Sequence, residues 1–542
     1  MKKNEIATMQ IIDYSTDGLG IAKAPDGMTV FIPSGAVGDI AKVLIVKELK
    51  KFCFGKIIEI VSPSKSRIKP DCEVFSRCGG CAYRHIDYAD ELTAKQKRVA
   101  DAISRIGGID THVNEVLSNH KTTRYRNKGQ YPVSSDKNGK CAAGFYSLHS
   151  HRVIPCDDCV LQPKEFSHIV KICIDFFNEK GILAYDEKTG KGLIRHIYLR
   201  RSDLTEKTVV CLVINGNALP FSDELIETLK SLEYVSGLAL NINTKKTNVI
   251  LGDKCKTLFG EEYITDSLLG VKFKISPLSF FQVNREMTET LYKTAADFAD
   301  VKGKTVLDLF CGAGTIGLTM AERAKKIIGV EIVPQAIENA KENAKMNGID
   351  NAEFICDSAA NAAKMLYDKG IHADVVLLDP PRKGATPDLI DTVCNSFAPE
   401  TVVYVSCDPA TLARDLKIFA EYGYKTDKIQ PVDLFPRTSH VETVCLLSKL
   451  NAKQHIEINL DMDELDLTDA EKKATYQEIK DYVLEHSGLK VSSLYIAHVK
   501  QMCGIIERDN YNKPKSEDAK QPQCPPDKEK AIKEALLHFG MI

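Results

Sequence analysis

The 542-residue chain lacks several features that would place it at once in a class of proteins. It has no apolar run of about 18 residues, so we expect no membrane-spanning helix. Its first nine residues contain two lysines but no apolar stretch, so we expect no secretory signal and a cytoplasmic protein. Internal repeats and long low-complexity tracts are absent as well. The length instead predicts about three or four domains, and 44% hydrophobic residues provide ample material for their cores.

A large net charge is also missing, since the formal charge is only −2. The local distribution is less even: residues 42–69 hold eight lysines and arginines against two acidic residues. Residues 120–152 hold seven against one. Basic stretches in a neutral protein favour a polyanion held at defined places, although solvated surface faces would give the same pattern.

The 17 cysteines do not form an evident disulfide framework, because their number is odd, the chain is long and no export signal is present. Three of them, Cys72, Cys78 and Cys81, lie in a glycine-rich stretch, and 74 residues separate Cys81 from the next pair, Cys156 and Cys159. Two Cys-x2-Cys pairs could hold zinc. Three close cysteines with one remote cysteine also suit a [4Fe–4S] cluster. The spacing alone leaves both metals open.

Short alternating runs separated by glycines, such as residues 29–33 and 40–46, predict a small β-barrel at the N-terminus. A helix is predicted over residues 93–106, and another follows Phe281 to about residue 299. Residues 451–473 are acidic and poor in aromatic residues, as expected of a linker. We therefore divide the chain into a β-barrel (1–65), a central mixed α+β domain (66–275), an α/β domain (276–450), this linker, and a small helical appendage (474–542).

From residue 304 onward the pattern consists of strand–turn–helix units, which predict a parallel, doubly wound sheet. Its first turn contains Gly312, Gly314 and Gly317, and Glu331 ends the next strand, where a carboxylate can accept both ribose hydroxyls of an adenosine. The glycines also satisfy the dinucleotide pattern G-x-G-x-x-G. An acidic residue at the strand end, Asp308, would repel a pyrophosphate but suits a cationic adenosine cofactor such as S-adenosylmethionine. A purely structural turn is the third interpretation.

Two further motifs follow predicted strands of this sheet. Asp379-Pro380-Pro381-Arg382 and Ser406-Cys407-Asp408-Pro409 both lie at carboxyl ends of strands, where open α/β sheets bind ligands. Each motif alone could simply end a strand. Glu442 begins the last apolar strand and is a candidate general base.

Together these segments resemble the RNA (uracil-C5-)-methyltransferase family. The resemblance covers roughly residues 5–450 and rests on Phe281–Asn284, Asp308–Gly312, Gly329–Glu331, Asp379–Arg382, Ser406–Pro409 and His440–Glu442. It implies a Rossmann-like class I methyltransferase domain in which Cys407 is the nucleophile and Glu442 the proton acceptor. It also implies S-adenosylmethionine contacts at Gln282, Phe310, Glu331 and Asp379. Asp408 departs from the family, in which many members have Asn after the cysteine, but this departure puts no catalytic role in doubt.

The chemistry fits these residue types. Uracil C5 is a weak nucleophile, and a thiolate that adds to C6 turns the ring into an enolate that reacts at C5. A base must then remove the C5 proton so that the thiol can leave. The target uracil must also leave its stack with neighbouring bases to reach Cys407, which implies a flipped-out or single-stranded uridine.

The ribosomal RNA branch of the family carries a [4Fe–4S] cluster at positions that match Cys72, Cys78, Cys81 and Cys159, and Cys156 is then a bystander. The N-terminal barrel resembles a TRAM domain, an OB-like RNA-binding module. The transfer RNA branch generally lacks both, so the resemblance implies 23S ribosomal RNA as the partner and 5-methyluridine as the product, with no membrane and no obligate protein partner. The alternatives are a transfer RNA methyltransferase and an RNA-binding iron–sulfur redox sensor whose methyltransferase domain is inert.

Overall fold

The computed structural model describes residues 1–450, 476–503, 524–539 and 541–542. The chain divides into two compact units, Met1–Asn451 and Ala452–Ile542. No helix within the described ranges is long and apolar enough to cross a membrane. The predicted linker, residues 451–473, lies outside the described residues.

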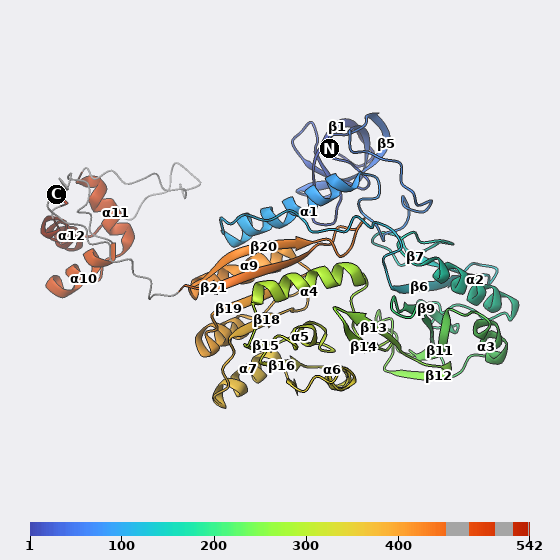
Figure 1. Cartoon of the computed structure of the whole chain (residues 1–542). Helices are drawn as coiled ribbons and strands as arrows, with labels where there is room; N and C mark the ends of the chain where they lie inside the picture. The colour runs from blue at the N-terminus through green and yellow to red at the C-terminus, as the bar shows by residue number, and fades with distance from the viewer. Residues whose placement is uncertain (451–475, 504–523, 540) are drawn as a thin grey trace. The chain divides into compact units, whose positions relative to one another are not determined.

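The N-terminal strands close into a five-stranded barrel in the order β1-β2-β3-β5-β4, which confirms the predicted β-barrel (Figure 1). Its strands are β1 (Ile6–Tyr14), β2 (Gly20–Lys23), β3 (Thr29–Ile32), β4 (Ile40–Glu48) and β5 (Phe52–Ser62). Buried and exposed residues alternate along β4, as expected for strands with one face on a core. Ile11, Val30 and Val43 are among the side chains that fill the barrel.

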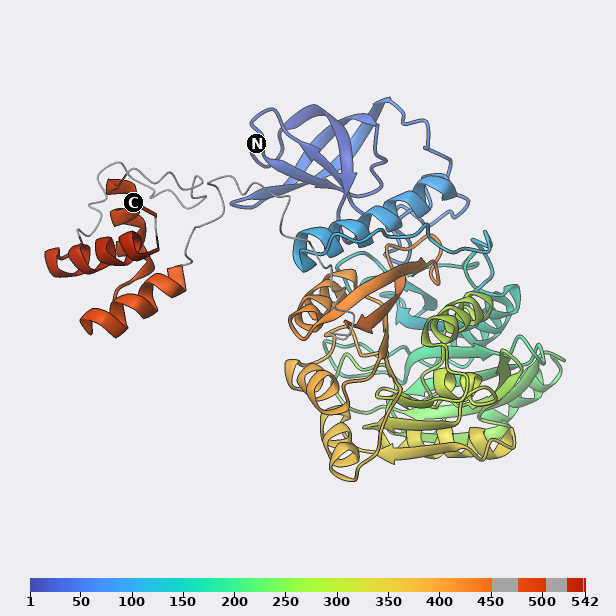
Figure 2. The same cartoon turned by 60° about the vertical axis from the view of Figure 1, so that its left-hand side comes forward.

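Helix α1 (Tyr88–Ala102) begins five residues before its predicted start and continues as a π-helical turn, η1 (Ile103–Gly107). Asp87 caps it by accepting a hydrogen bond from the backbone N–H of Asp90 (2.9 Å). The sequence therefore contained the start signal that we missed. Its residues Glu91, Lys95 and Val99 lie on one buried face, which packs on α9 (Pro409–Glu421) and β20 (Tyr424–Val432) (Figures 1 and 2).

The central region forms a second, seven-stranded sheet in the order β12-β11-β10-β9-β6-β7-β8. Its elements are β6 (Lys128–Ser135), β7 (Cys141–Tyr146), β8 (Val153–Pro155), α2 (Lys164–Glu179), β9 (Ile194–Arg201), β10 (Thr208–Ile214), α3 (Ser222–Lys230), β11 (Val235–Ile242) and β12 (Lys254–Gly260). The hairpin β13 (Ile264–Leu268) and β14 (Val271–Ile275) then leads toward the third sheet.

The third sheet has the order β17-β16-β15-β18-β19-β21-β20. Its elements are β15 (Thr305–Asp308), α5 (Thr315–Met320), β16 (Lys326–Glu331), α6 (Pro334–Met346), β17 (Ala352–Cys356), α7 (Ala359–Asp368), β18 (Val375–Leu378), α8 (Pro387–Asp391), η2 (Thr392–Phe397), β19 (Thr401–Ser406), α9, β20 and β21 (Glu442–Lys449). Strands β15 to β19 are parallel, but β21 runs antiparallel to both β19 and β20. The prediction of a purely parallel sheet was wrong at this edge, because β20 and β21 are joined directly by residues 433–441 without a crossover helix.

Helix α4 (Arg285–Ala299) covers this sheet and starts later than predicted. Asn284 is its N-cap and accepts a hydrogen bond from the backbone N–H of Met287 (3.4 Å). Phe281 to Val283 therefore remain outside the helix and lie against the cleft described below. Adjacent residues of β18 belong to different cores: Val376 packs in one and Val375 in the other, as in a sheet covered on both faces.

The second unit contains α10 (Tyr476–Ser487), α11 (Ser493–Met502) and α12 (Pro526–His538). These helices share a core of their own, which includes Ile479, Ile496 and Ile532. The predicted helical appendage is thus formed by helices that bury an apolar cluster among themselves.

Candidate active site

The turn after β15 leaves open space beside a fixed carboxylate. Gly312 (φ 55°) and Gly314 (φ 80°) adopt left-handed conformations, and a Cβ on Gly312 would meet no atom within 4 Å. The backbone N–H of Gly312 donates to Glu331 Oε2 (3.3 Å), and that of Val333 donates to Oε1 (3.0 Å). The Glu331 carboxylate is thereby held at the end of β16, next to the glycine turn, with room for a ligand.

A cleft of about 1280 Å³ brings together all six residues that the sequence assigned to catalysis and cofactor binding. These are Gln282, Phe310, Glu331, Asp379, Cys407 and Glu442. They come from the segment before α4 and from the carboxyl ends or following loops of β15, β16, β18 and β19, with Glu442 at the start of β21. Residues separated by up to 160 positions in the sequence therefore face one space.

Cys407 lies between β19 and α9, in a turn fixed by its neighbours. Asp408 caps α9 by accepting hydrogen bonds from the backbone N–H groups of Ala410 (2.9 Å) and Thr411 (3.0 Å). Asn can serve the same capping role, which explains why this departure from the family pattern leaves the turn intact. Burial, together with Glu442 and Asp379, raises the pKa of the Cys407 thiol to about 11.

The carboxyl groups in the cleft are held in an environment that disfavours their ionised forms. Burial and, to a smaller extent, the nearby Asp379 raise the pKa of Glu442 to about 8, while Arg382 opposes the shift. Burial also raises the pKa of Asp379 to about 7. A carboxyl with a pKa near 8 can act as a proton acceptor and donor close to neutral pH.

A second cavity of about 760 Å³ shares Cys407, Arg382 and His440 with the cleft. It extends away along α1 and the barrel, where Lys97 and Arg98 line it. The thiol therefore lies where two spaces meet, one beside the glycine turn and one bordered by the β-barrel.

The predicted metal ligands surround a third, smaller space. Cys72, Cys78, Cys81 and Cys159, together with Cys156, line a cavity of about 230 Å³. Across the residues that the structure describes, no group of three or more His, Cys, Asp or Glu side chains is arranged to hold a metal ion. Burial raises the pKa of Cys159 to about 12, and the thiols of Cys78 and Cys81 are shifted upward for the same reason.

Several residues at these sites were not singled out from the sequence. Arg382 is part of a quoted motif but had no role assigned, although it faces both Cys407 and Glu442. In the sequence, Glu91 and Lys95 form only an i,i+4 charge pair, which usually lies on an exposed helix face. Their burial could not be predicted locally, because their partners Asp433 and Arg437 lie more than 300 residues away.

Comparison with known proteins places this geometry in a family. Residues 87–450 match the family described as tRNA (uracil-5-)-methyltransferase. The chain is 43% identical to an RNA methyltransferase of Clostridium tetani, over 84% of this chain and 98% of the relative. It is 42% identical to an RNA methyltransferase of Halalkalibacterium halodurans, over 83% and 98%.

A solved structure shares the same architecture. The tRNA (uracil-54, C5)-methyltransferase of Pyrococcus abyssi in complex with S-adenosyl-L-homocysteine is 27% identical, with a TM-score of 0.66. The match covers 81% of this chain and all of that chain. The chain therefore belongs to the tRNA (uracil-5-)-methyltransferase family and is an S-adenosylmethionine-dependent enzyme that methylates uracil C5 in RNA.

Proposed function

We propose that the chain methylates C5 of a uridine in 23S ribosomal RNA, with Cys407 as covalent nucleophile and Glu442 as general base. The observation that carries this proposal is the single cleft that Cys407 and Glu442 share with Gln282, Phe310 and Glu331. A nucleophile, a base and a cofactor pocket in one space are what methyl transfer to C5 requires.

The two catalytic residues act at opposite ends of one covalent cycle. The Cys407 thiolate forms a bond to uracil C6, and the ring electrons make C5 nucleophilic. After C5 has gained the methyl group, Glu442 accepts the C5 proton. The resulting enolate re-forms the C5–C6 double bond and expels the Cys407 thiolate, which restores the enzyme.

Gln282, Phe310, Glu331 and Asp379 would hold S-adenosylmethionine, which supplies an electrophilic methyl group when it is bound. The fixed Glu331 carboxylate suits the ribose hydroxyls, and the open space at Gly312 allows close approach of a ligand. Asp379 lies nearer the reacting centre, because it shifts the pKa values of both Cys407 and Glu442.

The RNA strand would reach Cys407 through the cavity that runs along α1 and the barrel. Lys97, Arg98 and Arg105 from α1 and η1 line this cavity and can pair with phosphates. The target base must be unstacked to enter the cleft, since Cys407 lies at the meeting point of the two spaces.

The cysteine cavity fits a [4Fe–4S] cluster better than a single ion. Each cysteine of such a cluster binds a different iron, so the sulfurs surround a space and do not converge on one point. Arg84 is buried beside Cys81; its Nη1 pairs with Asp71, whereas its Nε and Nη2 have no hydrogen-bond partner among the described residues. An anionic cluster in the cavity would supply an acceptor for these two groups. Cys72, Cys78, Cys81 and Cys159 would be the ligands, and the cluster would brace the RNA-binding surface.

A transfer RNA is the second candidate substrate, because the Pyrococcus abyssi enzyme that acts on transfer RNA matches 81% of this chain. An assay with purified protein, labelled S-adenosylmethionine and both RNAs separates the two. We expect 5-methyluridine in 23S ribosomal RNA, and its absence from that RNA in cells that lack the gene. Methylation of transfer RNA alone would replace our proposal with the second candidate. An inert protein on both RNAs would favour a binding role.

A further inference from the structure

The loop that leads into Glu442 has an unusual backbone. Residues 433–441 join β20 to β21 and supply Phe435, Thr438 and His440 to the walls of the cleft. Arg437 in this 433–441 loop has a φ of 71°, a conformation that a non-glycine residue adopts only when its surroundings impose it. The surroundings must therefore hold the loop in place.

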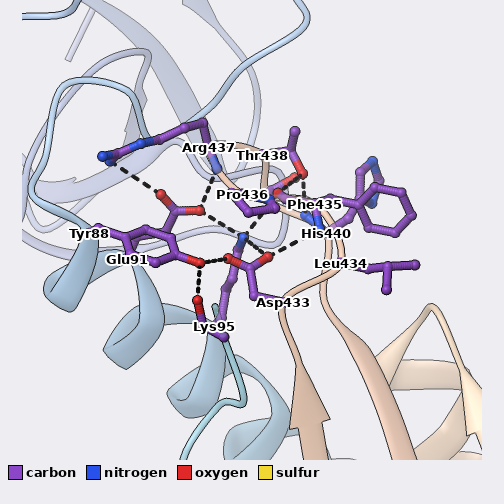
Figure 3. Close-up of polar contacts among 12 residues, drawn as sticks. Tyr88, Glu91, Lys95, Asp433, Leu434, Phe435, Pro436, Arg437, Thr438 and His440 are labelled. Atoms are coloured by element: carbon purple, nitrogen blue, oxygen red, sulfur yellow. Dashed lines mark hydrogen bonds and ion pairs between the residues drawn. The ribbon is translucent and has the colours of Figure 1, made fainter. Parts of the chain in front are cut away.

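Helix α1 provides much of that hold through buried charges (Figure 3). The Lys95 ammonium is fully buried and donates to Asp433 Oδ1 (2.7 Å), Glu91 Oε1 (2.8 Å) and the carbonyl oxygen of Phe435 (3.2 Å). The Tyr88 hydroxyl donates to Asp433 Oδ2 (2.7 Å). Asp433 and Phe435, at the start of the loop, are thus both hydrogen-bonded to helix α1.

Glu91 fixes the strained residue itself. Its Oε1 accepts the backbone N–H of Arg437 (2.6 Å), and its Oε2 accepts from Arg437 Nη1 (3.4 Å). The carbonyl oxygen of Arg437 in turn accepts the backbone N–H groups of Ala82 (2.8 Å) and Tyr83 (3.1 Å). The backbone N–H and C=O groups of Arg437 are therefore both bound by residues from the region before the methyltransferase sheet.

Three other carbonyl groups of the loop also accept hydrogen bonds from outside it. Asn284 Nδ2 donates to the carbonyl of Leu434 (3.1 Å), the Tyr125 hydroxyl donates to that of Pro436 (2.9 Å), and Arg98 donates to that of Ser439. Within the loop, Thr438 donates from its backbone N–H (3.1 Å) and its hydroxyl (2.8 Å) to the carbonyl of Phe435, and Asp433 Oδ1 accepts the backbone N–H of Phe435 (3.2 Å). The partners elsewhere in the chain add to these local bonds and hold the backbone on both sides of Arg437.

From these contacts we infer that Glu91 and Lys95 are positioning residues for the reaction: they hold the 433–441 loop so that Glu442 reaches the C5 proton. This inference rests on the proposed function, since it assumes that Glu442 is the base. The network contains two cations, Lys95 and Arg437, and two anions, Glu91 and Asp433, so its charges balance. It lies outside the cleft and does not contact the reacting atoms.

A positioning role can be distinguished from a general structural role by which reaction step is lost, because Glu442 acts only in the elimination. A displaced base slows only the elimination, so the methylated RNA should stay bound to Cys407. In Lys95→Met we expect this adduct to accumulate on a denaturing gel, with kcat lowered about 10²-fold and the KM for RNA close to that of the wild type. Glu442→Gln is the reference that shows how the trapped species migrates.

Removing Lys95 alone leaves an excess buried negative charge, which could unfold the protein. The double variant Glu91→Gln/Lys95→Met removes one charge of each sign and keeps the network neutral. It should recover thermal stability and still trap the adduct, because Asp433 and the Phe435 carbonyl lack their ammonium partner. Lys171→Met is the matched control: Lys171 also forms an i,i+4 helix pair, with Asp175, but it is exposed.

Three results would overturn the inference, and the third would overturn the assignment of the base as well. A folded double variant that turns over at the wild-type rate would show that the network does not position Glu442. Equal losses of adduct formation, methyl transfer and cofactor binding would show that it only supports the fold. If Glu442→Gln itself traps no adduct although the wild type methylates RNA, the assignment of the base is wrong, and the positioning role is lost with it.

Discussion

Glu442 should make the ligand-free protein less stable, because the fold buries a carboxyl that the unfolded chain exposes. Burial raises its pKa from an ordinary 4.5 to about 8, so between these pH values the folded protein keeps a proton that the unfolded chain releases. The free energy of unfolding therefore falls as pH rises through this window. At about 1.4 kcal/mol for each pKa unit, the loss is about 3 kcal/mol at pH 7 and about 5 kcal/mol above pH 8.

Glu442→Gln has no proton to lose, so it should be more stable than the wild type by these amounts. The difference should vanish below about pH 4.5, where the wild-type carboxyl is protonated in both states. The chain contains no tryptophan, so urea unfolding is best followed by circular dichroism at pH 4, 7 and 8.5. Glu338→Gln, at an exposed glutamate paired with Lys341, is the matched control.

The outcome that would refute this reasoning is a stability difference that does not change with pH. Equal stability of Glu442→Gln and the wild type at pH 8.5 would show that the carboxyl is hydrated or paired in the folded protein. A less stable variant at pH 8.5 would show that the ionised group forms favourable contacts, most directly with Arg382.

Three further predictions concern Glu442, the cysteine cavity and the C-terminal unit. Turnover should rise with pH toward about 8, because Glu442 must be deprotonated to act as a base; a pH–rate profile with its optimum below pH 6 would contradict this. Anaerobically purified protein should contain about four irons per chain; Cys159→Ser should lose them and Cys156→Ser should keep them, and stoichiometric zinc in the wild type would exclude the cluster. Deleting residues 471–542 should leave a folded enzyme that binds S-adenosylmethionine, since the helices of that unit have their own core; calorimetry that detects no binding would show otherwise.

The sequence predicted much of the methyltransferase sheet because its information is local. Alternating strands and helices, the glycine turn at Gly312 and the motifs after β18 and β19 each depend on a few neighbouring residues. The carboxyl ends of parallel strands meet at one edge, so placing Cys407 and Asp379 on such ends already implied that they lie close together. In the structure, Cys407 and Asp379 line the same cleft, as this placement implied.

The features that the sequence did not predict depend on distant partners. The direction of β21 depends on its pairing with β19 and β20, which the apolar pattern of the strand does not specify. The buried state of Lys95 depends on Asp433, and the left-handed conformation of Arg437 depends on Glu91, Ala82 and Tyr83. Local propensity would favour an exposed lysine and an ordinary arginine at these positions.

The ties between α1 and the 433–441 loop also determine when the protein can become functional during its synthesis. Lys95 and Asp433 are separated by 338 positions, and Glu91 and Arg437 by 346. A ribosome that has made α1 must add most of the remaining first unit before the ionic partners of the helix exist. Contacts of such high sequence separation form late and slowly. The nascent chain therefore carries Glu91 and Lys95 paired only with each other through most of its synthesis, and a chain that ends before residue 433 lacks both the proposed base and the loop partners of this helix.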